Sequence, residues 1–233
     1  MTSAPQLRYE FKVPCKAYLL PQVEAWVRLH PAHWRVTYSP RQVNNVYFDF
    51  LDQQNLNDNL SGVSSRRKLR LRWYGTDVER VTGGHFELKC KEGLVGWKEN
   101  VPCDLAFSLR DSAWVTLLQH IRRVAPERVR YWLEQASLPT LINHYWRSYY
   151  ETPDGVLRLT VDTKLRAFPQ QLAVTPDLSS PVANEGLLII ELKSPVNPPA
   201  YRRLREVLKN FPLRVERYSK YVQGMLAGFH LEG

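Results

Sequence analysis

The residues best suited to chemistry lie in one basic stretch, which runs from Arg66 to Gly75. If this stretch is a β-strand, its two-residue period puts four cations on one face and apolar side chains on the other. The cations are Arg66, Lys68, Arg70 and Arg72. Same-face neighbours lie about 7 Å apart in a strand, and the stretch contains no acidic residue to compensate their charge. The pattern indicates either a solvated outer face or a surface that binds an anion.

A second pattern, in which an acid and a base flank one apolar residue, occurs in three segments. In a strand, the acid and the base of each segment project to the same side. The segments are Glu10-Phe11-Lys12, Glu87-Leu88-Lys89 and Glu191-Leu192-Lys193. Nearly every expected strand likewise has one apolar face and one face that carries charged residues or tyrosine. The sequence therefore predicts a sheet with a strongly ionic side.

The periodicity of the chain predicts the elements that must position these side chains. Alternation typical of antiparallel strands occurs at 8–13, 43–50, 66–75, 86–91, 97–103, 141–151, 156–164 and 187–193. Helical spacing occurs at 21–30, between 105 and 136, at 198–209 and at 217–229. The polar segments 53–65 and 168–185 are expected to be loops.

The amphipathic helices favour an unusual arrangement of the sheet. Each helix needs an apolar surface to cover, and the apolar strand faces supply one. If the sheet closes on itself beneath the helices, the charged faces line an interior. Enclosing unpaired cations costs several kcal/mol each, and a bound anion would offset that cost. From the pattern alone, a charged lumen, a solvated sheet and a nucleic-acid platform remain open alternatives.

Composition limits the class of protein. A chain of 233 residues with 44% hydrophobic residues is typical of a globular protein, and we expect a single domain over residues 1–233. A formal net charge of +9 favours a polyanionic partner, which could be nucleic acid, an acidic membrane surface or a phosphate-rich small molecule. The three cysteines lack zinc-ligand spacing, and the sequence shows neither a signal peptide nor a membrane span. A cytoplasmic location is therefore expected.

An ordered set of motifs carries a resemblance to a known family. The motifs are RYEFK at 8–12, NVYFD at 45–49, KLRLRWYG at 68–75, FELK at 86–89, LTVDT at 159–163, IELK at 190–193 and YSKY at 218–221. Together they resemble the polyphosphate polymerase (VTC) domain of the CYTH-like triphosphate tunnel metalloenzyme superfamily. The resemblance implies an α+β fold in which an eight-stranded closed antiparallel β-barrel forms a tunnel with a charged lumen, covered outside by helices.

The resemblance also implies roles for individual residues. Phosphate contacts are expected for Lys12, Arg70, Arg72, Lys89, Lys98, Arg147, Arg158 and Lys220. The catalytic group is expected to comprise Glu191, Lys220, Arg70 and Arg72. Glu191, together with Glu10, is expected to hold a divalent metal ion, Mn²⁺ or Mg²⁺. Without the resemblance, Glu191 could instead pair with Lys193, Glu87 is expected to be a charge partner, and Asp162 could be a ligand or an arginine partner.

The expected reaction is metal-dependent phosphoryl transfer from ATP, or another nucleoside triphosphate, to inorganic polyphosphate. Hydrolytic members of the superfamily usually begin with Glu-x-Glu-x-Lys, whereas Arg8 replaces the first acid here. Loss of that carboxylate favours the polymerase over hydrolysis. A tripolyphosphate or nucleoside triphosphate hydrolase and a non-catalytic polyphosphate-binding module remain alternatives. No nucleic-acid partner is expected because no known reader motif is present, and a membrane-protein partner is left open.

Overall fold

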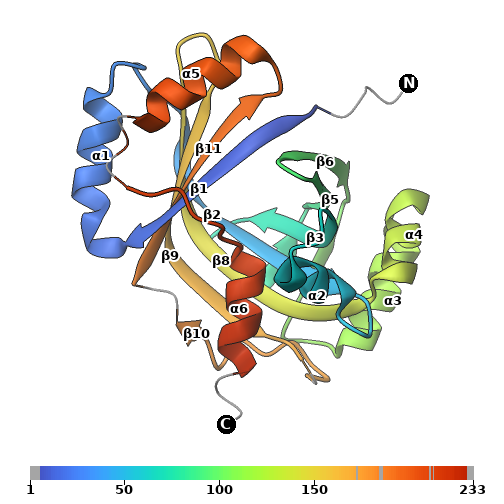
Figure 1. Ribbon diagram of the computed structural model, residues 1–233. Coiled ribbons are helices and arrows are strands. Elements are labelled where there is room, and N and C mark those ends of the chain that lie inside the picture. Colours follow the sequence, from blue (N-terminus) through green and yellow to red (C-terminus); the bar gives the residue numbers. More distant parts are fainter. Residues whose placement is uncertain (1–5, 172, 184–185, 210, 212, 230–233) are drawn as a thin grey trace.

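Eight strands of the protein form a closed antiparallel barrel in the computed structural model (Figure 1). The structure describes residues 6–171, 173–183, 186–209, 211 and 213–229. Around the barrel the order is β9-β11-β1-β6-β5-β3-β2-β8, and β8 pairs again with β9. These strands are β1 (Arg8–Lys16), β2 (Arg35–Asp49), β3 (Ser65–Tyr74), β5 (His85–Glu92), β6 (Val95–Pro102), β8 (Leu138–Glu151), β9 (Arg158–Pro169) and β11 (Leu187–Pro195).

The remaining elements are short strands and helices. Strands β4 (Arg80–Thr82) and β7 (Ala106–Ser108) form a separate ribbon, and β10 (Val182–Ala183) extends the edge of β9. The 3-10 helix η1 (Ala17–Leu19) leads into α1 (Leu20–Leu29). The other helices are α2 (Gln54–Ser61), α3 (Trp114–Val124), α4 (Glu127–Gln135), α5 (Pro198–Lys209) and α6 (Lys220–Phe229). Among the described residues, no helix is both long and apolar enough to span a membrane.

Two apolar cores lie outside the barrel, between the strands and the covering helices (Figure 1). Leu69, Leu71 and Trp73 of β3 are buried against α3 and α4. On the other side, Val13 of β1 and Leu192 of β11 belong to a core that includes residues of α1 and α5. The helices thus cover the apolar faces of the strands, as the sequence predicts, and the solvated-sheet alternative is wrong.

Helix α6 packs against the lumen-facing side chains at one end of the barrel. Tyr221 and Met225 form a buried cluster with residues Tyr47, Leu141 and Ala167 of three barrel strands. A Cβ atom at Gly224 would lie 2.8 Å from Leu141 Cδ2, so only glycine allows this close approach without a shift. The first residue of the helix, Lys220, therefore reaches the lumen.

The β1–β6 seam is the weakest join of the barrel. These two strands pair only at Arg8–Gly96 and Tyr9–Val95. Farther along β1, the backbone N–H of Glu216 donates to the carbonyl of Lys12 at 2.9 Å. The segment that precedes α6 thus contacts the edge of β1 that β6 leaves free.

Three segments show how the observed element boundaries differ from the sequence expectation. The expected loop 53–65 contains α2, because the Asp49 carboxylate accepts N–H bonds from Asn55 and Leu56 and so caps the helix from a neighbouring strand. Strand β2 begins at Arg35 rather than residue 43, since its early residues pair with β8. Of the expected loop 168–185, Phe168 and Pro169 extend β9, and β10 forms a short strand. Residues 172, 184 and 185 lie outside the described residues.

Candidate active site in the barrel lumen

The lumen-facing positions carry more cations than carboxylates. Strand alternation and the pairing register turn the ionic face of each strand inward. The carboxylates are Glu10, Glu87, Asp162 and Glu191, and the cations around them are Arg8, Lys12, Arg70, Arg72, Lys89, Lys98, Arg147, Lys193 and Lys220. Three clusters of contacts organise these side chains.

Glu87 is the centre of the first cluster, and its side chain is only 1% exposed. It accepts hydrogen bonds from Arg70 Nε at 2.8 Å and from Lys98 Nζ at 2.6 Å, and Arg72 Nη1 lies 3.5 Å away. Burial alone would raise the pKa of Glu87, but Arg70 and Arg72 hold that pKa well below its usual value. Glu87 is therefore a charged partner that orients cations, as the sequence predicts.

Neutral side chains fix the orientation of Arg72. Its Nε donates to Asn45 Oδ1 at 2.9 Å, and its Nη2 donates to the Tyr145 hydroxyl at 3.1 Å. Asn45 in turn donates to Asn143 Oδ1 at 2.8 Å. Because these bonds use neutral acceptors, the positive charge of Arg72 is only partly compensated, by Glu87.

Glu191 and Asp162 form the second cluster with cations from three elements. Lys193 of β11 donates from Nζ to Glu191 Oε2 at 2.9 Å, which is the pairing that the sequence alone allows for Glu191. Arg147 of β8 donates from Nε to Asp162 Oδ1 at 2.5 Å and from Nη2 to Glu191 Oε2 at 3.3 Å. Lys220 of α6 lies 2.5 Å from Asp162 Oδ2 and 3.1 Å from Glu191 Oε1. Both carboxylates raise the pKa of Lys220 against the lowering effect of burial. The first residue of α6 is thus a charged group of the lumen.

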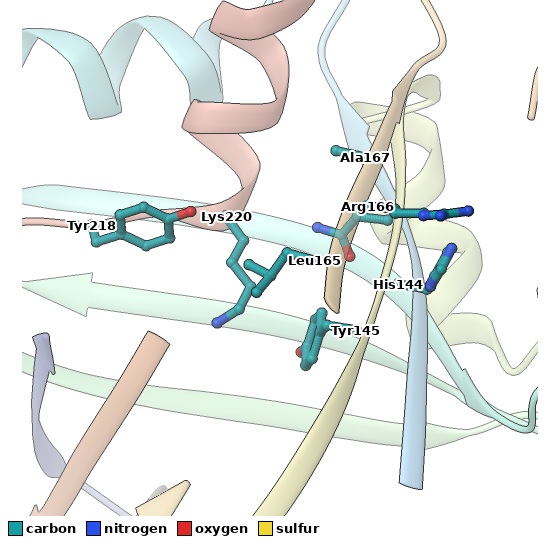
Figure 2. A pocket seen from close by; sticks show the side chains of 8 residues that line it. His144, Tyr145, Leu165, Arg166, Ala167, Tyr218 and Lys220 are labelled. Carbon is teal, nitrogen blue, oxygen red and sulfur yellow. The ribbon is translucent and has the colours of Figure 1, made fainter. Parts of the chain in front are cut away.

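Figure 2 shows the surroundings of Lys220. Lys220, Tyr145 and Leu165 lie on one side of the wall formed by β8 and β9, whereas His144 and Arg166 lie on the other. The lysine Nζ lies 4.9 Å from the centre of the Tyr145 ring. Lys220, Tyr145 and Leu165 line a small pocket together with Tyr218. Tyr218 packs with Tyr145 and Leu165 in an apolar cluster inside the barrel.

The third cluster contains three lysines and one acid. Lys89 Nζ donates to the two oxygens of Glu10 at 2.7 and 3.0 Å, and Lys12 Nζ lies 3.4 Å from Glu10 Oε1. Burial lowers the pKa of Lys89 to about 7, although Glu10 opposes the shift. Lys68 donates to Ser219 Oγ at 2.7 Å. Burial and the charges of Lys12 and Lys89 hold the pKa of Lys68 well below its usual value.

Most of the predicted site residues come together in these clusters. The structure brings together Glu10, Lys12, Arg70, Arg72, Lys89, Lys98, Arg147, Glu191 and Lys220. Arg158 is the exception. It shares the face of Asp162 but lies exposed at the first position of β9, opposite Lys193. It is therefore separated from the buried clusters.

Several lumen residues were not among the predicted site residues. Lys68 and Lys193 could have been included, because they share a strand face with Arg70 and Glu191. Tyr145 shares a strand face with Arg147, but single neutral polar residues such as Tyr145, Asn45 and Asn143 occur in many strands and do not by themselves indicate a site. Their role follows only from the cross-strand pairs that place them beside Arg72.

The donor set suits a metal ion that also takes ligands from its substrate. Among the described residues, no group of three His, Cys, Asp or Glu side chains is gathered for metal binding. Glu10 and Glu191 both approach Lys12, whose Nζ is 3.4 Å from one and 3.9 Å from the other. Mg²⁺ is commonly held by one or two carboxylates together with phosphate oxygens. Glu191, with Glu10, would supply the carboxylates. Phosphates would have to draw away the cations that contact them, above all Lys89 on Glu10 and the pair of Lys193 and Lys220 on Glu191.

The closed barrel and its inward-facing ionic side chains define an anion-binding tunnel protein. Residues 7–229 match the VTC domain family, and the chain belongs to this family of triphosphate-binding and phosphotransfer proteins. No curated protein matches the sequence.

Solved structures to which the chain is similar include two at low sequence identity. A chain of the Schizosaccharomyces pombe Mediator head module is 10% identical, with a TM-score of 0.51 over 90% of this chain and 97% of that one. A candidate adenylate cyclase from Vibrio parahaemolyticus is 14% identical, with a TM-score of 0.49 over 94% of this chain and 99% of that one. The Mediator chain supports the fold alone.

Proposed function

We propose that the protein transfers the γ-phosphoryl group of ATP to the end of a polyphosphate chain held in the barrel lumen. The observation that carries the proposal is the group of three lysines, Lys12, Lys68 and Lys89, which has Glu10 as its nearest acid. Lys68 contacts a serine hydroxyl and lies 5.6 Å from the centre of the Tyr221 ring. A polyanion beside these lysines would remove their mutual repulsion.

The extent of the basic surface favours a chain as the ligand. Arg66, Lys68, Arg70 and Arg72 occupy one face of β3, and this row spans about 20 Å at the rise of a strand. The row continues to Lys91, which lies opposite Arg66 on β5, and toward Arg217, whose charge adds to burial in lowering the pKa of Arg66. Such a row is longer than the three phosphates of one nucleotide and can hold donor and acceptor together.

The chain's own residues would act by positioning and by stabilising charge, which are the main requirements of phosphoryl transfer. Arg70, Arg72 and Arg147 present planar guanidinium groups that pair with phosphate oxygens in two-point contacts. A divalent ion at Glu191 and Glu10 would polarise the transferred group. A terminal phosphate oxygen forms the new bond to the γ-phosphorus, while the bond between that phosphorus and the β–γ bridging oxygen breaks and ADP leaves. The attacking oxygen is already anionic and needs no general base.

The environment of Arg8 bears on the hydrolytic alternative. Its Nε lies 4.0 Å from Glu10 Oε2, so a cation stands beside the acid where hydrolytic relatives are expected to have a second carboxylate. The single acid at this end of β1 is already bonded to Lys89. This arrangement supports phosphate binding more than activation of water.

Incubation with ATP and Mn²⁺ tests the proposal, with products separated by anion-exchange chromatography. We expect ADP and long polyphosphate from the wild type, and loss of both from Glu191→Gln and Arg70→Ala. Lys209→Ala on α5 is the matched control, because it removes a cation from an exposed surface pair. Free phosphate as the only product would favour the hydrolase, and tight polyphosphate binding without turnover would favour the binding module. Unchanged polyphosphate synthesis in both lumen variants would refute the site assignment.

A further inference from the structure

A cluster of tyrosines surrounds Arg41 outside the three ionic clusters. The Arg41 guanidinium lies 4.0 Å from the centre of the Tyr74 ring, 5.1 Å from that of Tyr149 and 5.5 Å from that of Tyr38. Arg41 Nε also donates to the Tyr149 hydroxyl at 3.2 Å. We call Tyr38, Tyr74 and Tyr149, together with Arg41, the tyrosine rim.

The register places the tyrosine rim at one mouth of the lumen. Tyr149 follows Arg147 on the same face of β8, and Tyr74 follows Arg72 on the same face of β3. Arg41 pairs across the strands with Arg147. These positions lie at the opposite strand ends from Tyr47 and Leu141, which α6 covers. The rim therefore continues the ionic wall outward at the end that α6 leaves uncovered.

The rim is open to ligands. Tyr38 is 57% exposed and Tyr74 is 36% exposed, so aromatic surface faces solvent where a core position would bury it. The Arg41 guanidinium already contacts aromatic faces and a hydroxyl, so the surface left for stacking is the exposed part of the Tyr38 and Tyr74 rings. Exposed aromatic rings at the mouth of a cationic lumen suit a ligand with one flat end and one anionic end.

We propose that the tyrosine rim is a subsite for the base of a nucleoside triphosphate whose phosphates lie in the lumen. This inference rests on the proposed function, because it assumes that the lumen holds the phosphates. Tyr149 is two residues from Arg147, which corresponds to about 7 Å along the strand. A nucleotide whose phosphates contact Arg147 would thus bring its sugar and base to the rim.

The chemistry of the rim predicts a broad preference for nucleotides over inorganic triphosphate. Stacking on an aromatic ring uses the π-face that every base has. Adenine and guanine nucleotides should therefore bind with similar affinity. The rim selects a nucleoside, whereas the lysines and arginines of the lumen select phosphate.

Isothermal titration calorimetry at fixed Mg²⁺ with ATP, GTP and tripolyphosphate tests the subsite. In Tyr74→Leu we expect the ratio of ATP affinity to tripolyphosphate affinity to fall about tenfold from its wild-type value. GTP should follow ATP, and tripolyphosphate affinity should change by less than about twofold. Tyr74→Phe, which keeps the ring, should retain the wild-type ratio. Tyr131→Leu on α4 is the control, since it removes an exposed tyrosine on an outer helix.

The binding measurements and the polyphosphate synthesis assay distinguish failure of the base subsite from failure of the proposed polymerase function. An unchanged affinity ratio in Tyr74→Leu overturns the subsite and leaves the lumen assignment intact. Equal weakening of ATP and tripolyphosphate also overturns it, because that result indicates damage to the lumen. Wild-type protein that binds ATP with the expected dependence on Tyr74 but forms no polyphosphate refutes the polymerase proposal alone. Failure of the wild type to bind tripolyphosphate overturns both.

Discussion

Replacing Glu87 with glutamine should destabilise the empty protein and make it respond more strongly to an added polyanion. Glutamine keeps the size of the side chain and one acceptor oxygen, so the substitution mainly removes charge. In the wild type, Glu87 contacts Arg70 and Arg72 of β3 and Lys98 of β6. The variant leaves these cations facing one another with a neutral amide between them.

The structure sets the size of the effect. Breaking a buried ion pair by removing one partner costs about 3–5 kcal/mol. The side chains of Arg70 and Arg72 are 16% and 7% exposed, so they remain enclosed, whereas that of Lys98 is 35% exposed and can turn toward water. A value near the lower limit, about 3 kcal/mol, is therefore expected. For a chain of this size it corresponds to a fall in Tm of about 6–12 °C.

Thermal unfolding followed by circular dichroism, with and without tripolyphosphate, measures both parts of the prediction. A ligand at a hundred times its Kd stabilises the folded state by about 2.7 kcal/mol. At matched saturation the gain should be larger in Glu87→Gln than in the wild type, since the anion also replaces the missing charge. Glu206→Gln is the control, because its exposed pair with Lys209 should contribute less than about 1 kcal/mol. A fall in Tm below 2 °C for Glu87→Gln would refute the view that Glu87 compensates the enclosed cations.

Four further predictions concern the lysines, the lumen carboxylates and the packing of α6. Lys68→Met should raise the Tm of the empty protein and weaken tripolyphosphate binding, because it removes a repelled cation; a lower Tm would contradict this. The pKa of Lys89 is lowered to about 7, so this lysine is mostly neutral at pH 8, and binding of tripolyphosphate should protonate it with uptake of close to one proton. Calorimetry in buffers of different ionisation enthalpy measures the uptake, and Lys89→Arg should abolish it. The pKa values of Glu10, Glu87 and Glu191 are lower in the folded protein than the ordinary carboxyl value of about 4.5, so these ionised groups stabilise the fold fully above that pH. The stabilisation should be lost as the pH falls through the lower pKa values of the folded protein, and acid titration of unfolding measures the loss. Gly228→Val should lower stability by about 1–3 kcal/mol, since even a Cβ atom would lie 2.6 Å from Pro169 Cγ; an unchanged Tm would refute the tight packing of α6.

The strand faces could be predicted from sequence because their period is short and their chemistry is extreme. Arg70, Arg72 and Trp73 show the alternation clearly, and Leu69 and Leu71 are buried where the pattern requires. Closure of the barrel could not be predicted from the period of the strands. It depends on pairing β1 with β11 and β8 with β9, and the first of these pairs lies far apart along the chain.

The candidate site was predictable to the extent that its residues are charged and lie on strands. The phosphate-binding role expected for Lys220 rested on the resemblance alone, because no strand period reaches this residue. The sequence pattern placed it inside a helix over 217–229, whereas it is the first residue of α6. Arg158 shares the alternation of β9, yet sequence gave no sign that it lies exposed at the end of the strand. The capping of α2 by Asp49 also escaped prediction, since the carboxylate belongs to the preceding strand. The local period of a sequence indicates which side chains share a face of a strand or helix, whereas the residues at which an element begins and ends depend on tertiary contacts.

The pairing of the first barrel strand with the last has a consequence for how the chain acquires its structure. Lys12 lies opposite Glu191, so its strand waits until synthesis has passed residue 191 before that neighbour exists. Contacts of such long sequence separation slow folding, because a long loop must close before they form. Until then the basic strands remain hydrated and accessible to any polyanion nearby. Closure of the barrel between β1 and β11 is therefore expected to be a late and slow step of folding.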